Sequence, residues 1–261
     1  MKCFFRTKYK DITLFIFYIY TMLFISPPFG TYFHLPYTQS IKGSFTIQSR
    51  PGLFKQIIST LYYSKENSGW VNKIGLRNPG IDFAIHKYNK SIFPFYRNSI
   101  ISIAILEEKD IELFLEKIPK EMSLEINVSC PNTEEQLIQK KLSGFLNDKR
   151  KWCSIKVSPN TTLNEIGAFY DQGFRIFHCC NTIPIKNGGL SGPSIIPKAS
   201  ALIIEIKEKY DDVEIIAGGG IQNIDVYKSY KKIGATHFSV SSLLFHPFKF
   251  MKFYWDYCHQ E

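Results

Sequence analysis

A chain of 261 residues, 44% of them hydrophobic, has the length for one large α/β domain or two small ones with a substantial core. The net charge of +9 is carried by scattered lysines and not by a basic stripe, so we expect no nucleic-acid binding; the charge suits an anionic small molecule or a phosphate-bearing cofactor. The six cysteines form no Cys-x-x-Cys pair, which argues against a metal site, and no regular framework like that of small secreted domains, which favours a reducing compartment such as the cytoplasm.

The N-terminal segment, residues 1–20, is basic and then apolar. Lysines and an arginine precede the apolar run Ile12–Ile25, as in a signal peptide or a membrane anchor. The run has about fourteen residues, fewer than the roughly twenty that span a bilayer, and no small-x-small cleavage site follows it. We therefore expect the domain to cover residues 21–261, with a first strand over Met22–Ser26. Residues 1–20 have no assigned role, and their association with a membrane is the alternative.

Downstream of this segment, strand-like apolar runs alternate with helix-like segments, and no linker or repeat separates two domains. Further strands are predicted over Ser40–Ile47, Ser99–Ile105, Ser123–Val128, Cys153–Val157, Phe174–Cys179, Val213–Ala217 and Thr236–Val240. Helices are predicted over Asp110–Ile118, Thr133–Leu146, Leu163–Tyr170, Pro197–Tyr210 and Asp225–Ile233. The alternation predicts a single-domain α/β fold, a (β/α)₈ TIM barrel with trimmed loops; a doubly wound parallel sheet is the alternative.

The motif Asn127-Val-Ser-Cys-Pro-Asn132 follows the predicted strand Ser123–Val128. A cysteine thiol has a reference pKa of about 8.5, so surroundings that favour the thiolate make it a base near neutral pH. The flanking carboxamides of Asn127 and Asn132 offer hydrogen-bond donors and acceptors to a substrate. The motif therefore predicts a base between two substrate clamps. An ordinary strand-to-loop junction with a buried cysteine is the alternative.

Other polar residues fall on or after later strands, whose following loops converge on one face if the fold is a barrel. Lys156 lies within the apolar strand Cys153–Val157, and Asn181-Thr182 follows the strand Phe174–Cys179. An inward lysine among apolar neighbours needs an anionic or electron-rich partner, whereas an outward lysine would be solvated. These residues predict an active site at the carboxyl ends of the strands.

Two glycine-rich segments, Asn187–Gly192 and Ala217–Ile221, follow further along the chain. Glycines allow backbone N–H groups to approach phosphate oxygens, and loops after the last two strands of a barrel often bind phosphate. Here those loops hold Gly218–Ile221 and Ser241-Ser242, and neither glycine segment has the Gly-Lys-Ser/Thr ending of a P-loop. The segments therefore predict a phosphate site.

Taken in order along the chain, these stretches resemble dihydroorotate dehydrogenases, flavin-dependent barrel enzymes that oxidise dihydroorotate to orotate in pyrimidine synthesis. The resemblance is carried by Gly43–Thr46 with Arg50 and Gly52, Asn72–Gly80, Asn127–Asn132, Ile155–Val157, Asn181-Thr182 with Gly188–Gly192, and Ile215–Ile221 with Gly234-Ala235 and Ser241-Ser242.

The resemblance implies FMN as cofactor and Cys130 as the general base that removes the C5 proton of dihydroorotate, while hydride passes from C6 to flavin N5. It implies that the substrate is bound by Asn72, Gly75, Leu76, Asn127, Asn132, Asn181 and Thr182. It implies that FMN is bound by Gly43, Ser44, Lys156, Gly192, Gly219, Gly220, Ser241 and Ser242. Lys156 would lie near flavin N1, where a cation stabilises the charge of the reduced ring.

With a cysteine as the base, the chain resembles the soluble branches of the family, whose members are often homodimers. The electron acceptor stays open among fumarate, a quinone and a partner flavoprotein. Only a short stretch joins Gly30 to Ser40, where the family has a helix, and Gly43 stands where soluble members have an active-site lysine. Lys42, one position earlier, is expected to face the other side of its strand. These departures leave two alternatives, another FMN barrel oxidoreductase of the dihydropyrimidine or dihydrouridine type and a non-catalytic barrel homologue.

Overall fold

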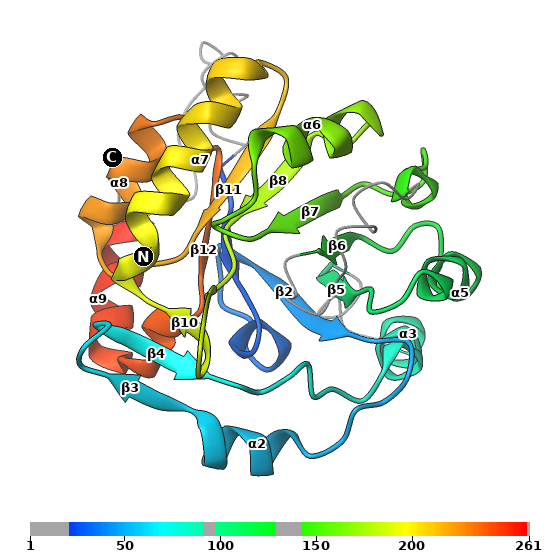
Figure 1. Cartoon of the computed structure of the whole chain (residues 1–261), viewed down its shortest axis with the longest axis horizontal. Coiled ribbons are helices and arrows are strands. Elements are labelled where there is room, and N and C mark those ends of the chain that lie inside the picture. Colours follow the sequence, from blue (N-terminus) through cyan, green and yellow to red (C-terminus); the bar gives the residue numbers. More distant parts are fainter. Residues whose placement is uncertain (1–20, 91–97, 129–141, 260–261) are drawn as a thin grey trace, which may run out of the picture.

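The computed structural model describes residues 21–90, 98–128 and 142–259, and its centre is a closed barrel of parallel strands (Figure 1). The strands follow the order β1-β12-β11-β8-β7-β6-β5-β2 around the barrel. They are β1 (Leu23–Ile25), β2 (Thr38–Phe45), β5 (Ile100–Ala104), β6 (Leu124–Asn127), β7 (Cys153–Val157), β8 (Ile176–Cys179), β11 (Glu214–Gly218) and β12 (His237–Val240). The predicted barrel is confirmed, each strand end lies within two residues of its prediction, and the doubly wound sheet is excluded.

All the described helices except α2 (Leu53–Thr60) cover the outside of the barrel, whereas α2 has no buried residue and lies beside the segment Gly69–Asn72 (Figure 1). The others are α3 (Ile81–Lys90), α5 (Lys109–Lys117), α6 (Leu163–Asp171), α7 (Ile196–Lys209), α8 (Ile224–Lys232) and α9 (Pro247–Cys258). Helices α5 to α8 confirm four predictions, whereas α2, α3 and α9 were not predicted. The predicted helix Thr133–Leu146 lies mostly outside the described residues, and its described end is a 3-10 turn, η3 (Leu142–Phe145). Among the described residues, no helix is both long enough and apolar enough to cross a bilayer. The N-terminal segment, residues 1–20, lies outside them.

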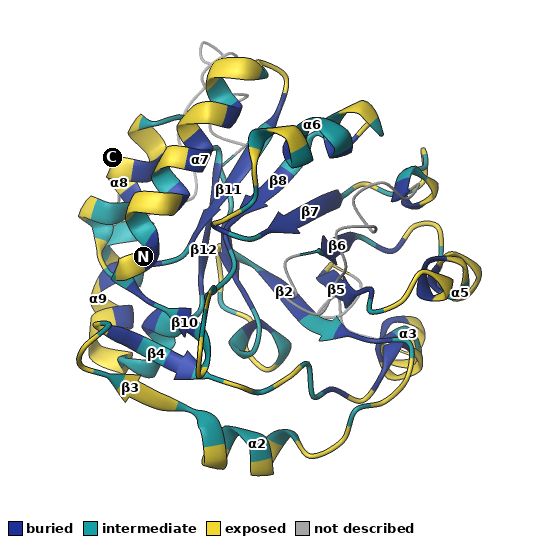
Figure 2. Cartoon of the chain, viewed as in Figure 1, coloured by how far each residue is buried: buried dark blue, intermediate teal, exposed yellow. Residues whose placement is uncertain are grey.

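Alternation along the strands separates an outer apolar core from a mixed interior. Outward side chains such as Ile126, Ile155 and Phe177 are fully buried under the helices, as the dark blue strands of Figure 2 show. Inside the barrel, a separate small cluster consists of Phe24, Ile41, Ile100 and Ile216. Nearer the carboxyl ends of the strands the inward residues become polar, so the barrel has an apolar plug beneath a polar layer.

Between β1 and β2 the described chain forms one 3-10 turn, η1 (Phe29–Thr31). The side chain of Lys42 fastens this turn, since its Nζ donates to the carbonyl oxygens of Gly30 at 3.1 Å and Thr31 at 3.4 Å. Burial lowers the pKa of Lys42 to about 8. Lys42 pairs in register with Ile101 of the outer core, so it faces outward, as the one-residue offset predicted.

Replacing Gly30 with alanine is expected to lower the free energy of unfolding by about 1–3 kcal/mol, the usual cost of overpacking. A Cβ at this position would collide with the backbone carbonyl oxygens of Ile25 and Ile41, so η1 would have to move off the barrel. Urea denaturation measures the change. The control is Gly167→Ala in α6, where the new methyl group meets the side-chain hydroxyl of Tyr210 and helix propensity improves. An unchanged urea midpoint for Gly30→Ala would contradict this tight contact.

A second, antiparallel sheet of four strands was not predicted from the sequence. Its order is β3 (Tyr62–Ser64), β4 (Gly69–Asn72), β10 (Gly188–Ser191) and β9 (Ile183–Ile185). Pairing of Asn72 with Gly189 joins two segments that are far apart in the chain. The sheet thereby brings Asn72 to the same end of the molecule as the residues that follow β8.

Candidate active site

Two adjoining cavities lie at the carboxyl ends of the barrel strands, with volumes of about 580 Å³ and 90 Å³. They share walls, since both are lined by Pro27, Lys156, Asn181, Thr182, Ser191, Ser241 and Ser242. The predicted site residues on the larger cavity are Gly43, Ser44, Asn72, Gly75, Leu76, Asn127, Lys156, Asn181, Thr182, Ser241 and Ser242. Those on the smaller cavity are Lys156, Asn181, Thr182, Gly192, Gly219, Gly220, Ser241 and Ser242. Cys130 and Asn132 lie outside the described residues.

The larger cavity combines carboxamide groups with an apolar wall. Asn127 ends β6, is 5% exposed, and donates from Nδ2 to the hydroxyl of Ser44 at 3.0 Å. Asn72 reaches the cavity from β4. The apolar wall includes Trp70 and Phe245, whose ring centroids are 4.6 Å apart. Such a lining suits a small planar ligand with polar edges.

The smaller cavity is lined in part by glycines and serines. Gly219 and Gly220 follow β11 with φ of 84° and 78°, a region that favours glycine. A Cβ on Gly220 would lie 3.0 Å from the carbonyl oxygen of Gly192, so the two glycine segments are in close contact. The hydroxyl of Ser241 donates to the carbonyl of Pro27 at 2.8 Å, which ties β12 to the loop after β1. A narrow concavity of glycine backbone and serine hydroxyls suits a phosphate group.

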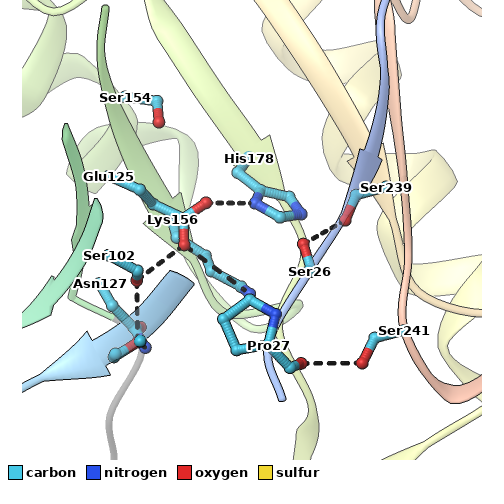
Figure 3. A network of polar contacts seen from close by, with 12 residues as sticks. Ser26, Pro27, Ser102, Glu125, Asn127, Ser154, Lys156, His178, Ser239 and Ser241 are labelled. Carbon is cyan, nitrogen blue, oxygen red and sulfur yellow. Dashed lines mark hydrogen bonds and ion pairs between the residues drawn. The ribbon is translucent and has the colours of Figure 1, made fainter. Parts of the chain in front are cut away.

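Lys156 lies where the cavities meet and points into the barrel (Figure 3). Its side chain is 10% exposed, so the alternative of an outward, solvated lysine is wrong. Its Nζ lies 4.0 Å from Oε1 of the fully buried Glu125 on β6. The inward position therefore comes with the anionic partner that a buried lysine requires.

Glu125 and His178 form a buried pair beneath Lys156 that sequence reasoning missed. Glu125 accepts from Ser102 Oγ at 2.9 Å and pairs with His178 Nδ1 at 2.6 Å. Burial alone would raise the pKa of Glu125, but Lys156 and His178 outweigh it and lower that pKa to about 2. Burial, and then Lys156, lowers the pKa of His178, while Glu125 acts to raise it. Because a carboxylate oxygen only accepts, the imidazole donates its Nδ1 proton to Glu125. The available signal was alternation, because Glu125 shares the inner face of β6 with Asn127.

The family model for dihydroorotate dehydrogenase matches residues 38–172. The chain is 30% identical over 244 residues to "Dihydroorotate dehydrogenase B (NAD(+)), catalytic subunit" of Staphylococcus carnosus, with 83% of this chain and 80% of the relative covered. The protein of the same name from Malacoplasma penetrans is 27% identical over 245 residues, with 83% and 80% covered.

Among solved structures, the chain resembles ligand-free DHODH from Eimeria tenella with a TM-score of 0.65 at 16% identity, covering 88% of this chain and 80% of that one. This likeness supports the barrel fold. The family match extends over more than half of the chain, and the relative from Staphylococcus carnosus is covered over most of its length. The chain therefore belongs to the dihydroorotate dehydrogenase family.

Proposed function

We propose that this chain uses FMN to oxidise dihydroorotate to orotate in pyrimidine biosynthesis. The observation that carries the proposal is the junction at Lys156, where a glycine-lined cavity suited to phosphate opens into a carboxamide-lined cavity suited to a planar substrate. One elongated cofactor can reach from the first cavity into the second. Family membership supports the same reading.

The residues present fit FMN. A Cβ at Gly192, Gly219 or Gly220 would crowd neighbouring parts of the chain, so these positions on the smaller cavity favour glycine, whose backbone can approach a phosphate closely. Lys156 is placed to neutralise charge on a ring system at the junction, and Gly43 and Ser44 line the wall beyond it. When bound, FMN supplies the two-electron acceptor for the hydride that leaves C6 of the substrate.

The chain's own residues would bind the substrate and remove its proton. Cys130, as thiolate, takes the proton from C5, and the electron pair of that C–H bond becomes the C5–C6 double bond of orotate. The carboxamides of Asn127, Asn132, Asn72 and Asn181, with the hydroxyl of Thr182, would hold the amide and carboxylate edges of the substrate. Gly75 and Leu76 would add backbone N–H groups, since their φ values of 67° and 56° form a left-handed turn beside the cavity.

Anaerobic titration of the FMN-loaded protein with dihydroorotate is expected to bleach the flavin absorbance stoichiometrically. Dihydrouracil and dihydrouridine, which lack the carboxylate, serve as matched comparison substrates and are expected to leave the flavin oxidised. Bleaching by one of these two in preference to dihydroorotate would favour a dihydropyrimidine- or dihydrouridine-type oxidoreductase. Failure to retain FMN would favour the non-catalytic homologue.

The electron acceptor we propose is a partner flavoprotein, because relatives from Staphylococcus carnosus and Malacoplasma penetrans are named as NAD(+)-type catalytic subunits. The bleached protein from the titration tests this choice, since rapid reoxidation by fumarate or a quinone alone would contradict it. A homodimer is part of the same proposal, and sedimentation of the FMN-loaded protein measures it.

A further inference from the structure

Three consecutive barrel strands contribute a charged cluster directly beneath the cavities (Figure 3). Lys156 on β7 pairs in register with Asn127 of β6 on one side and with His178 of β8 on the other. Glu125 reaches from β6 past β7, so that its two oxygens meet Lys156 and His178. The cluster therefore brings a lysine, a carboxylate and an imidazole together within a single layer of the barrel.

Hydrogen bonds fix the carboxylate of Glu125 from two sides. His178 Nδ1 approaches Oε2 at 2.6 Å, and Ser102 Oγ approaches Oε1 at 2.9 Å. Ser102 is in turn 2.8 Å from Ser44 Oγ, which accepts from Asn127. A chain of hydrogen bonds thus runs from the buried carboxylate to two residues on the wall of the larger cavity.

In the described part of the chain, few other ionisable groups face this layer. The hydroxyls of Ser26 and Ser239, 2.5 Å apart, face it from neighbouring strands, and Cys180 lines the smaller cavity beside His178. A second Glu–His pair, half-exposed Glu214 with buried His237, lies at the amino ends of β11 and β12 and lines neither cavity. Glu125 is therefore the carboxylate that Lys156 meets in this layer.

We infer that Glu125, held by His178 and Ser102, is the counter-charge of Lys156 and thereby sets the midpoint potential of FMN bound above it. The inference rests on the proposed function for the identity of the cofactor. Reduction adds negative charge to the flavin ring, which a cation beside the ring stabilises. A carboxylate 4.0 Å from that cation offsets part of the effect. Glu125 is thus a positioning residue that acts through Lys156.

The test is to measure the midpoint potential of bound FMN in variants that remove the charge of Glu125, of Lys156, or of both. Glu125→Gln keeps the size of the side chain, and its Oε1 can accept from His178 while its Nε2 donates to Ser102 Oγ. The change removes the negative charge, so the potential is expected to rise. The ratio of the affinities for reduced and oxidised FMN is expected to change at least tenfold, which corresponds to a shift of about 30 mV for a two-electron couple. Lys156→Met is expected to lower the potential, and the double variant is expected to return towards the wild-type value because both charges are gone.

The matched control is Glu214→Gln, which removes the carboxylate of the other Glu–His pair away from the cavities. Its potential is expected to equal that of the wild type, even if its stability falls. A potential for Glu125→Gln that is unchanged or lowered would overturn the inference.

A cofactor-free measurement separates this inference from the proposed function. In the apoprotein, Glu125→Gln leaves a buried lysine without its counter-charge, whereas the double variant with Lys156→Met removes both charges. The double variant is therefore expected to unfold at a higher urea concentration than Glu125→Gln alone. Strict additivity of the two single changes would overturn the pairing. If the wild-type protein retained no FMN, the proposed function would fail, yet this comparison would still decide whether Glu125 and Lys156 are coupled.

Discussion

Replacing Cys130 with alanine is expected to slow the reduction of bound FMN by dihydroorotate about 10²–10⁴-fold, the usual contribution of a general base. Alanine cannot accept the C5 proton, so the C–H bond would have to break without a base at that position. FMN binding is expected to stay intact, because the predicted cofactor contacts come from other segments of the chain. Stopped-flow absorbance under anaerobic conditions measures the rate, and the flavin content of the purified variant measures binding.

Two further variants sharpen this test of the base. Cys130→Ser replaces the thiol with a hydroxyl, a group of similar size that is a much weaker acid, so its rate is expected to fall between those of the wild type and the alanine variant at neutral pH. Cys258→Ala removes an exposed thiol at the end of α9 and is expected to reduce its flavin at the wild-type rate. Wild-type reduction by Cys130→Ala would reject the cysteine as the base and leave the motif Asn127–Asn132 with a structural role.

Replacing Gly220 with alanine is expected to weaken FMN binding about 10- to 100-fold. The residue has a φ of 78°, and its new methyl group would lie 3.0 Å from the carbonyl oxygen of Gly192 and 2.5 Å from a side-chain carbon of Ile196. Relief of these contacts would separate the two glycine segments and lose one or two hydrogen bonds to the phosphate, each worth about 1.5–3 kcal/mol for a charged acceptor. Fluorescence titration of the apoprotein with FMN measures the dissociation constant.

The control for Gly220→Ala is the same substitution at another left-handed glycine. Gly173 has a φ of 102° and follows α6, away from both cavities, and its Cβ would meet a side-chain carbon of Leu146. Gly173→Ala is expected to lower stability through backbone strain and to leave FMN affinity unchanged. Equal losses of affinity in the two variants would mean that the effect at Gly220 is one of folding and not of a phosphate site.

The barrel could be predicted because each of its strands is a short apolar run whose local sequence pattern favours a single conformation, that of a buried strand. Runs such as Cys153–Val157 and Glu214–Gly218 are buried on both faces, and the helices between them show the 3.6-residue pattern of a one-sided cover. The glycine segments could be assigned to loops for a local reason as well, because Gly219 and Gly220 adopt φ values that other residues avoid. The small antiparallel sheet escaped prediction, since its strands are only three or four residues long and pair across distant segments.

The alternation of strands and helices, the glycine loops and the motif around Cys130 could be read from the sequence, because each depends on contacts between near neighbours in the chain. The inward direction of Lys156 and the contact of Glu125 with His178, 53 positions along the chain, depend on the tertiary fold. The pattern of a strand shows which of its residues share a face. Whether a buried side chain can stay charged depends on the polar and charged side chains that neighbouring strands place next to it. Barrel closure fixes those neighbours, and so it joins one lysine, one carboxylate and one imidazole into the floor of the candidate site.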